Sequence, residues 1–255
     1  MRLIEFIGHW TLRLLGRVVL LLGSVLGYLP RLPKDWRLVV KQMVVFGADS
    51  LPLVLLIGSF TGAIAALQAT NLFDKFNLLA LARPYLGSSI ATVVFTELTP
   101  VLTALVITGR VGGAIAAQIG AMAVSEQLDA LEIMAIDRNR YLALPRVVAA
   151  LTMMPVLAVF SNVVAILGAL TLTTLKFDVS PGLFFDSVQR FFRTSEVVLG
   201  LLKSAVFGGV TALIGCAEGF ATVGGAEGVG RSTVRAFTTS AATILVLDAL
   251  FGYVL

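Results

Sequence analysis

The chain has 255 residues, of which 58% are hydrophobic and 13% charged, and its mean hydropathy is +0.96. A soluble domain carries about 25% charged residues, so this composition predicts an integral membrane protein. One cysteine excludes an internal disulfide, and a single histidine leaves few residues for a metal site or for histidine-based catalysis. The formal charge of +4 is scattered along the chain, which argues against a nucleic-acid partner.

The first 30 residues hold two apolar features. In residues 1–18 the charged side chains gather on one helical face and large apolar ones on the other, which predicts a helix lying in the cytoplasmic membrane interface. The run 18–30 is uncharged but has 13 residues, too few to cross about 30 Å of hydrocarbon, so we expect a membrane-embedded or re-entrant piece. A cleaved signal peptide is the alternative, but Glu5 and Arg13 interrupt the apolar run and no small-residue cleavage site follows.

Five longer stretches are apolar enough to cross a membrane as helices: 50–73, 90–122, 147–175, 197–217 and 236–255. Outside them, Lys and Arg residues are twice as numerous on the side of the N-terminus as on the other side. The N-terminus is therefore expected in the cytoplasm, and five spans then place the C-terminus outside.

The second stretch has 33 residues, about 50 Å as a helix, which exceeds the hydrocarbon thickness. We expect it to tilt, to kink at Pro100, or to project into the cytoplasm. Small residues recur every fourth position here and in the first span, a spacing typical of ordinary close helix packing in membranes. These rows are Gly112, Ala116 and Gly120, and Gly58, Gly62 and Ala66.

A short charged helix over 125–135 follows the second span on the cytoplasmic side. Ser125 is expected to cap it, with Glu126, Asp129 and Glu132 on one face and Leu128, Leu131 and Met134 on another. An acidic face beside an apolar ridge suits insertion into a groove on a partner, and a solvated connector is the alternative.

Motifs for chemistry are weak. Residues 225–232 imitate a phosphate-binding loop, but Arg231 replaces the lysine, so we interpret them as a flexible turn before the last span. Lys203 and Ser204 are adjacent in a helix and do not face each other. Glu97 within a span implies a cavity, a partner or a function, or else a hydrogen-bonded acid at the interface. Asp248 and Gln68 carry the same argument more weakly.

Three segments resemble one family. Residues 109–157, GRVGGAIAAQIGAMAVSEQLDALEIMAIDRNRYLALPRVVAALTMMPVL, resemble the signature region of the MlaE/YrbE-type permeases, the membrane subunits of Mla, Mce and related ABC lipid transporters. Residues 224–237, GGAEGVGRSTVRAF, and 244–251, ILVLDALF, are similar to the end of the same family. The resemblance implies one permease domain over 1–255, all α-helical, with N-terminal helices in 1–48 and a five-span core in 50–255.

The resemblance also implies partners. Two copies of the chain would enclose a lipid cavity in the inner membrane, sit on two cytoplasmic ATPase subunits that hold ATP and Mg²⁺, and meet an MCE-domain protein on the periplasmic side. This chain would have no catalytic residue, metal or cofactor of its own. The coupling residues would be Glu126, Gln127, Leu128, Asp129, Leu131 and Glu132, and the lipid cavity would be lined by Leu67, Gln68, Val94, Glu97, Leu98 and Val101.

The sequence departs from the family pattern in two places. Where members often have RELGPV, this chain has TELTPV over residues 96–101, so an arginine that could contact a phosphate is replaced by Thr96. Arg138 stands in place of a common proline, which we expect to loosen the exit of the coupling helix.

Two other classes of function stay open from the residues alone. An ion-coupled secondary transporter would need no ATPase and would usually show internal repeats, which the five spans lack. A membrane-embedded lipid-modifying enzyme would need a nucleophile or metal site that His9 and Cys216 do not supply.

Overall fold

The computed structural model describes residues 2–76 and 79–254, and the side chains of residues 12–76 and 81–253. Within them every regular element is helical. The α-helices are α1 (Arg2–Tyr28), α2 (Trp36–Phe46), α3 (Leu51–Lys75), α4 (Leu79–Ala82), α5 (Leu86–Val93), α6 (Thr99–Ile107), α7 (Gly113–Val124), α8 (Gln127–Ile133), α9 (Leu144–Phe177), α10 (Pro181–Phe191), α11 (Thr194–Phe220) and α12 (Gly225–Val254).

Six stretches of the described chain are long and apolar enough to cross a membrane. They are Leu12–Lys34, Trp36–Lys75, Arg83–Val124, Asn139–Phe177, Thr194–Phe220 and Gly225–Tyr253. The last five contain the five predicted spans, apart from the final two residues of the chain, so the predicted all-α membrane fold is confirmed. The structure adds Leu12–Lys34 as a sixth candidate by length and composition.

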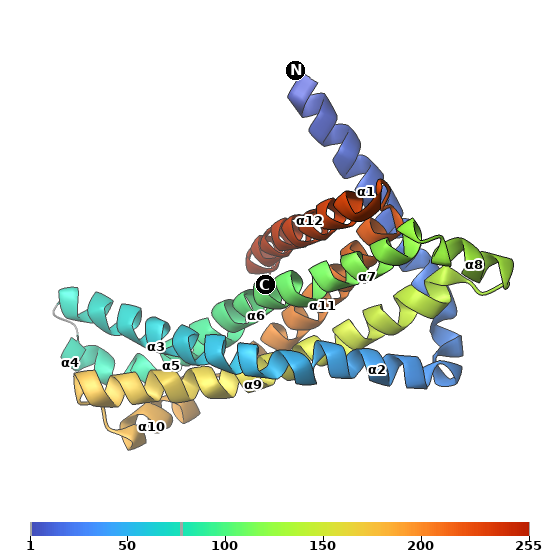
Figure 1. Cartoon of the computed structure of the whole chain (residues 1–255). Helices are drawn as coiled ribbons and strands as arrows, with labels where there is room; N and C mark the ends of the chain where they lie inside the picture. Colours follow the sequence, from blue (N-terminus) through green and yellow to red (C-terminus); the bar gives the residue numbers. More distant parts are fainter. Residues whose placement is uncertain (1, 77–78, 255) are drawn as a thin grey trace.

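The N-terminal region is one helix where the sequence indicated two pieces. Helix α1 continues through the expected re-entrant run to Tyr28, because no residue in 18–28 interrupts a helix. Figure 1 shows α1 crossing the end of the bundle at which α8 lies, and it packs on α11 and on residues 139–143. The position of this helix in the membrane interface stays a prediction. The side chains of residues 1–11, which form much of the predicted amphipathic face, lie outside the described residues.

The second predicted span is interrupted twice by π-helical turns, at Val94–Leu98 and Thr108–Gly112. Pro100 has no backbone N–H to donate to the carbonyl of Thr96, and the Thr96 hydroxyl donates to the Thr92 carbonyl at 2.8 Å. The Thr99 N–H instead reaches back five residues to Val94. The expected irregularity at Pro100 is therefore a π-turn, a form of helix that is frequently found at functional sites.

Close packing between helices depends on the predicted rows of small residues. Helix α3 lies along α9, and a Cβ at Gly62 would overlap the carbonyl of Ala165. Helix α7 lies against α11, where a Cβ at Gly112 would come within 2.9 Å of Thr211. In lipid the helices gain no hydrophobic driving force by associating, so such contacts and buried hydroxyl bonds hold the bundle. Thr108 and Thr211 form one of these bonds, at 2.9 Å.

The predicted flexible turn at residues 225–232 is wrong. Gly224 and Gly225 have positive φ angles, and α12 begins at Gly225. The helix begins this early because Gly228 packs on the Val223 carbonyl, where any Cβ would overlap it. Ser232 is buried in the second turn of α12 and accepts a hydrogen bond from the Thr222 hydroxyl at 2.9 Å, so these residues form a packed corner.

Replacing Gly62 by alanine should separate α3 from α9 and lower stability by about 1–3 kcal/mol, the usual cost of overpacking. The matched control is Gly230→Ala on α12, where a Cβ would meet no atom within 4 Å. Stability is read as the temperature at which the purified protein loses its monodisperse gel-filtration peak. Equal midpoints for the two variants would contradict the close α3–α9 contact.

Candidate functional site

Three charged side chains from three different spans meet inside the bundle. The Lys203 ammonium on α11 donates to Glu97 Oε1 at 2.8 Å and to Asp248 Oδ1 at 2.9 Å. The Lys203 side chain is fully buried, whereas Glu97 keeps 46% and Asp248 21% of its side-chain surface exposed. A cation cannot remain in a low-dielectric interior without such partners, so the three residues act as one unit.

The backbone around this charged cluster brings the three residues together. Glu97 lies in the π-helical turn Val94–Leu98, which packs on α11. Gly200, one turn before Lys203, lies directly on the carbonyl of Phe95, and a Cβ there would overlap it. The close approach of α11 to the π-turn therefore sets the distance that Lys203 spans. Sequence reasoning noted Glu97, Lys203 and Asp248 separately, and it missed that they meet.

A mainly apolar pocket of about 320 Å³ lies between α3 on one side and the end of the π-turn and α6 on the other. Of the predicted cavity residues, Gln68 and Leu98 line this pocket together, with Phe60, Ile64 and Leu102 among the apolar walls. Glu97 is adjacent in sequence to Leu98 but bonds to Lys203. The pocket can hold an apolar chain beside one amide, which is the chemistry of a lipid tail close to a polar group.

The other predicted cavity residues lie elsewhere in the single chain. Val94 is completely buried in the core formed by α3, α5, α9 and α10. Leu67 and Val101 are partly buried and lie outside the lining of the pocket, and Val101 packs against the larger core. The structure of one chain thus brings together two of the six residues at the pocket and places Glu97 beside it.

The predicted coupling residues form a short exposed helix at the opposite end of the bundle from α10 (Figure 1). Leu128 is buried and Leu131 packs against the core, so these two side chains anchor α8. Glu126, Gln127, Asp129 and Glu132 are exposed. Ile133 and Met134 are exposed as well, at 86% and 61%. An anchored helix that displays both acids and large apolar side chains is suited to a protein partner.

Ser125 does not cap this helix, contrary to the sequence prediction. Its hydroxyl donates to the Ala121 carbonyl at 2.8 Å and thus closes α7. Glu126 follows with a left-handed backbone, φ 58°, which separates α7 from α8. At the far end Ala135 is also left-handed, and the Ile136 N–H bonds to the Leu131 carbonyl, which is a Schellman ending. Both ends of α8 are therefore sharp turns with defined geometry.

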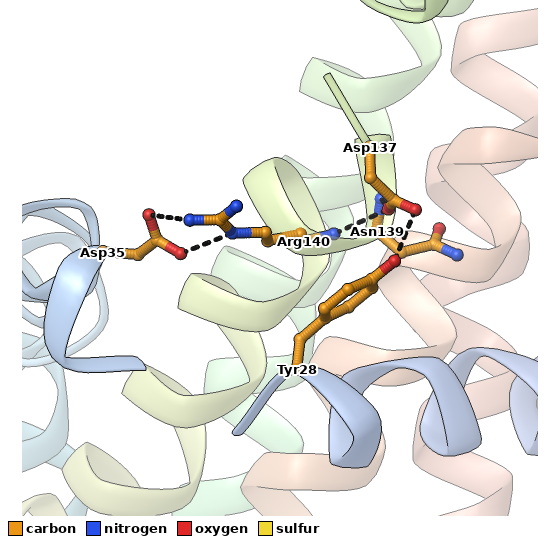
Figure 2. A network of polar contacts seen from close by, with 5 residues as sticks. All are labelled: Tyr28, Asp35, Asp137, Asn139 and Arg140. Carbon is orange, nitrogen blue, oxygen red and sulfur yellow. Dashed lines mark hydrogen bonds and ion pairs between the residues drawn. The ribbon is translucent and has the colours of Figure 1, made fainter. Parts of the chain in front are cut away.

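A polar network ties the exit of α8 to the corner between α1 and α2 (Figure 2). The Tyr28 hydroxyl donates to Asp137 Oδ2 at 2.7 Å, and Asp137 Oδ1 accepts the amides of Asn139 and Arg140. Arg140 binds both carboxylate oxygens of Asp35, at 2.9 and 3.2 Å. A bidentate arginine pair fixes orientation as well as distance. Asp137 is thus the hub between α8, α9 and the end of α1.

The electrostatics of Asp137 follow from this network. Partial burial acts to raise the pKa of its carboxyl, but the bonds from Tyr28, Arg140 and Asn139 and the charge of Arg138 outweigh burial and lower the pKa. The carboxylate therefore stays ionised at neutral pH and keeps accepting all three hydrogen bonds.

Arg138, expected to loosen this exit, makes two contacts of its own. Its guanidinium lies 5.5 Å from the centre of the Phe220 ring at the end of α11. It also lies 3.4 Å from Glu132 Oε1, in a pair that is largely exposed and so contributes little to stability. The Arg138 side chain is therefore held against the end of α11.

Replacing Lys203 by methionine should lower stability by about 3–5 kcal/mol, because two carboxylates then face each other without a cation. Adding Glu97→Gln and Asp248→Asn to this variant should restore most of the loss, since a neutral replacement of a buried ion network is often nearly neutral in free energy. The measurement is the heat stability of the purified protein by gel filtration. A triple variant no more stable than Lys203→Met would show that the charges are not what couples these positions.

Comparisons with known proteins agree with this architecture. A sequence model of the family described as Permease MlaE matches residues 39–254. A Rickettsia bellii protein named as a probable ABC transporter permease is 36% identical, over 96% of this chain and 94% of that one. The Haemophilus influenzae intermembrane phospholipid transport system permease protein MlaE is 34% identical, over 92% and 89%. Arabidopsis thaliana Protein TRIGALACTOSYLDIACYLGLYCEROL 1, chloroplastic, is 35% identical, over 84% and 60%. The chain therefore belongs to the MlaE permease family.

Proposed function

We propose that this chain is the permease subunit of an ABC transporter that moves phospholipid, or a related lipid, between the inner membrane and an MCE-domain partner on the periplasmic side. Two copies of the chain would form the lipid path, and separate cytoplasmic ATPase subunits would bind ATP and Mg²⁺ and supply the energy. The N-terminus and α8 would then lie in the cytoplasm and the C-terminus in the periplasm.

The observation that carries this proposal is the arrangement of α8. Leu128 and Leu131 fix the helix to the core, while its three polar residues, and Glu126 just before it, are exposed. The Asp137 network then joins its exit to α1 and α2. A push on α8 would be transmitted to the bundle and not absorbed by a loose loop. That rigidity is what a permease needs where a separate ATPase docks, and what a solvated connector does not need.

The pocket with Gln68 and Leu98 supports lipid as the substrate. It lies along α3 and α6, beside the charged cluster, and its lining is mostly apolar. The relative from Haemophilus is named for intermembrane phospholipid transport, which agrees with such a lining. In a dimer the partner copy would close the open side of this pocket and bring a second set of the same residues to it.

The alternative of a lipid-modifying enzyme finds no support in the contacts of the candidate nucleophiles. Ser204 donates its hydroxyl to the Gly200 carbonyl at 2.8 Å, and the Lys203 ammonium is held by two carboxylates. The Cys216 thiol is buried in the packed core. Neither the Ser204 hydroxyl nor the Cys216 thiol has a hydrogen bond to a histidine or a carboxylate among the described residues, and the two carboxylates beside Lys203 are held in its ion pairs. We therefore propose a non-catalytic role for this chain.

The test is a double charge reversal, Glu126→Lys with Asp129→Lys, in the complex purified with its ATPase. Both residues are exposed, so the permease should fold normally, whereas reversed charges at an interface cost several kcal/mol. We expect ATPase copurification to fall at least tenfold, the change that about 1.4 kcal/mol produces. ATP-dependent transfer of fluorescent phospholipid between liposomes should fall with it.

The matched control is Asp74→Lys with Asp186→Lys, the same charge change on exposed residues at the α10 end of the bundle. This control should retain the ATPase. Normal ATPase binding and lipid transfer in the Glu126 and Asp129 variant would contradict docking at α8. Lipid transfer by the chain alone, driven by an ion gradient without ATP, would instead favour a secondary transporter.

A further inference from the structure

A second pocket, far from the one with Gln68 and Leu98, lies under α1 at the α8 end of the bundle. Its volume is about 310 Å³. One wall is α1, with Leu20 and Leu21, and the other is the end of α11, with Phe220 and Ala221. Two arginines from distant parts of the chain, Arg17 and Arg138, complete it.

The two arginines are prepared to bind an anion. Arg17 forms no ion pair among the side chains that the structure describes. Arg138 lies over the Phe220 ring, which orients its guanidinium without using its N–H donors. Its contact with Glu132 is an exposed pair at 3.4 Å, which a better acceptor can replace.

The position of the pocket selects the kind of anion. Helix α1 crosses the end of the bundle (Figure 1). Away from the pocket it exposes Leu15 at 59% and Val19 at 63%. Those side chains need acyl chains around them, so this part of α1 lies at the depth where lipid tails meet headgroups. An arginine pair at that depth with apolar walls beneath it matches one phosphate and one acyl chain. Basic pockets between membrane helices on the cytoplasmic side are known to bind such headgroups.

We infer that this pocket binds the phosphate of an anionic phospholipid in the leaflet at the α8 end, with an acyl chain against Leu20 and Phe220. The site is outside the proposed transport pocket and does not depend on the direction of transport. Because Arg138 lies in the segment that joins α8 to α9, a bound headgroup would bridge α1 to the exit of α8. An anionic lipid would then strengthen the connection between α1 and the exit of α8 that the Asp137 network also makes.

The experiment uses the full chain with a photo-crosslinking residue in place of Leu20, which is exposed and lines the pocket. The probe is vesicles of phosphatidylcholine with a minority of phosphatidylglycerol, and mass spectrometry identifies the captured lipid. We expect phosphatidylglycerol to be captured well above its share of the vesicle. Arg17→Gln with Arg138→Gln should weaken that preference at least tenfold, the change that about 1.4 kcal/mol produces, because the phosphate loses both charged donors of the pocket.

Arg13→Gln with Arg37→Gln is the matched control, since it removes the same charge from exposed residues at this end of the chain that do not line the pocket. This control should keep the preference for phosphatidylglycerol within about twofold. The loss in the Arg17 and Arg138 variant would then come from the pocket and not from the change in net charge. Capture in proportion to vesicle composition, or an equal loss in both double variants, would overturn the site. Displacement of the lipid by inorganic phosphate would show that the arginines bind a free anion and would overturn the lipid assignment.

Discussion

The buried ammonium of Lys203 is the constraint on which the transmembrane part of this protein depends. A charge within a span is tolerated only where partners surround it, and here the partners come from two other spans, Glu97 and Asp248. Satisfying Lys203 therefore fixes α11 against both the π-turn and α12. The same contact places Leu98, the next residue after Glu97, at the wall of the apolar pocket. The charged cluster and the pocket therefore share the π-turn Val94–Leu98.

At the end of the bundle where α8 lies, hydrogen bonds near the surface hold the helices together. Helix α8 is short, and a helix of seven residues is not stable alone. Its sharp ends at Glu126 and Ala135, the anchor of Leu128 and the bonds to Asp137 together hold it in place. The second pocket under α1 lies beside these contacts, so in this proposal the end that would meet an ATPase is also the end that would bind charged lipid.

The sequence predicted the helices better than the contacts between them. Apolar runs of 20 or more residues with at most two charged residues located the spans, because a helix must be about that long to cross hydrocarbon. Spacing by four residues located Gly62 and Gly112, which do pack against other helices. Leu128 and the exposed acids of α8 followed from a simple amphipathic pattern. These features depend on residues close together in the chain, and local spacing is sufficient for them.

The features that the sequence missed depend on residues far apart in the chain. Lys203 lies more than 100 positions from Glu97, and one sequence cannot give the rotation of α11 that turns the lysine toward it. The sequence predicted a kink at Pro100 but not a π-turn. The π-turn also involves the contact of Gly200 with the carbonyl of Phe95, and these two residues are far apart in the chain. The sequence predicted that Arg138 loosens the exit of α8. Its contact with the Phe220 ring could not be predicted, because the two residues are far apart in the chain.

The central claim is that lipid enters the pocket between α3 and α6 and leaves it when ATP acts on a separate subunit bound at α8. Electron cryomicroscopy of the complex in a lipid bilayer tests it most directly. The account predicts acyl-chain density between Gln68 and Leu98 without nucleotide, and its loss when a non-hydrolysable ATP analogue is bound. A pocket that is filled by side chains of the second copy in both states would contradict it.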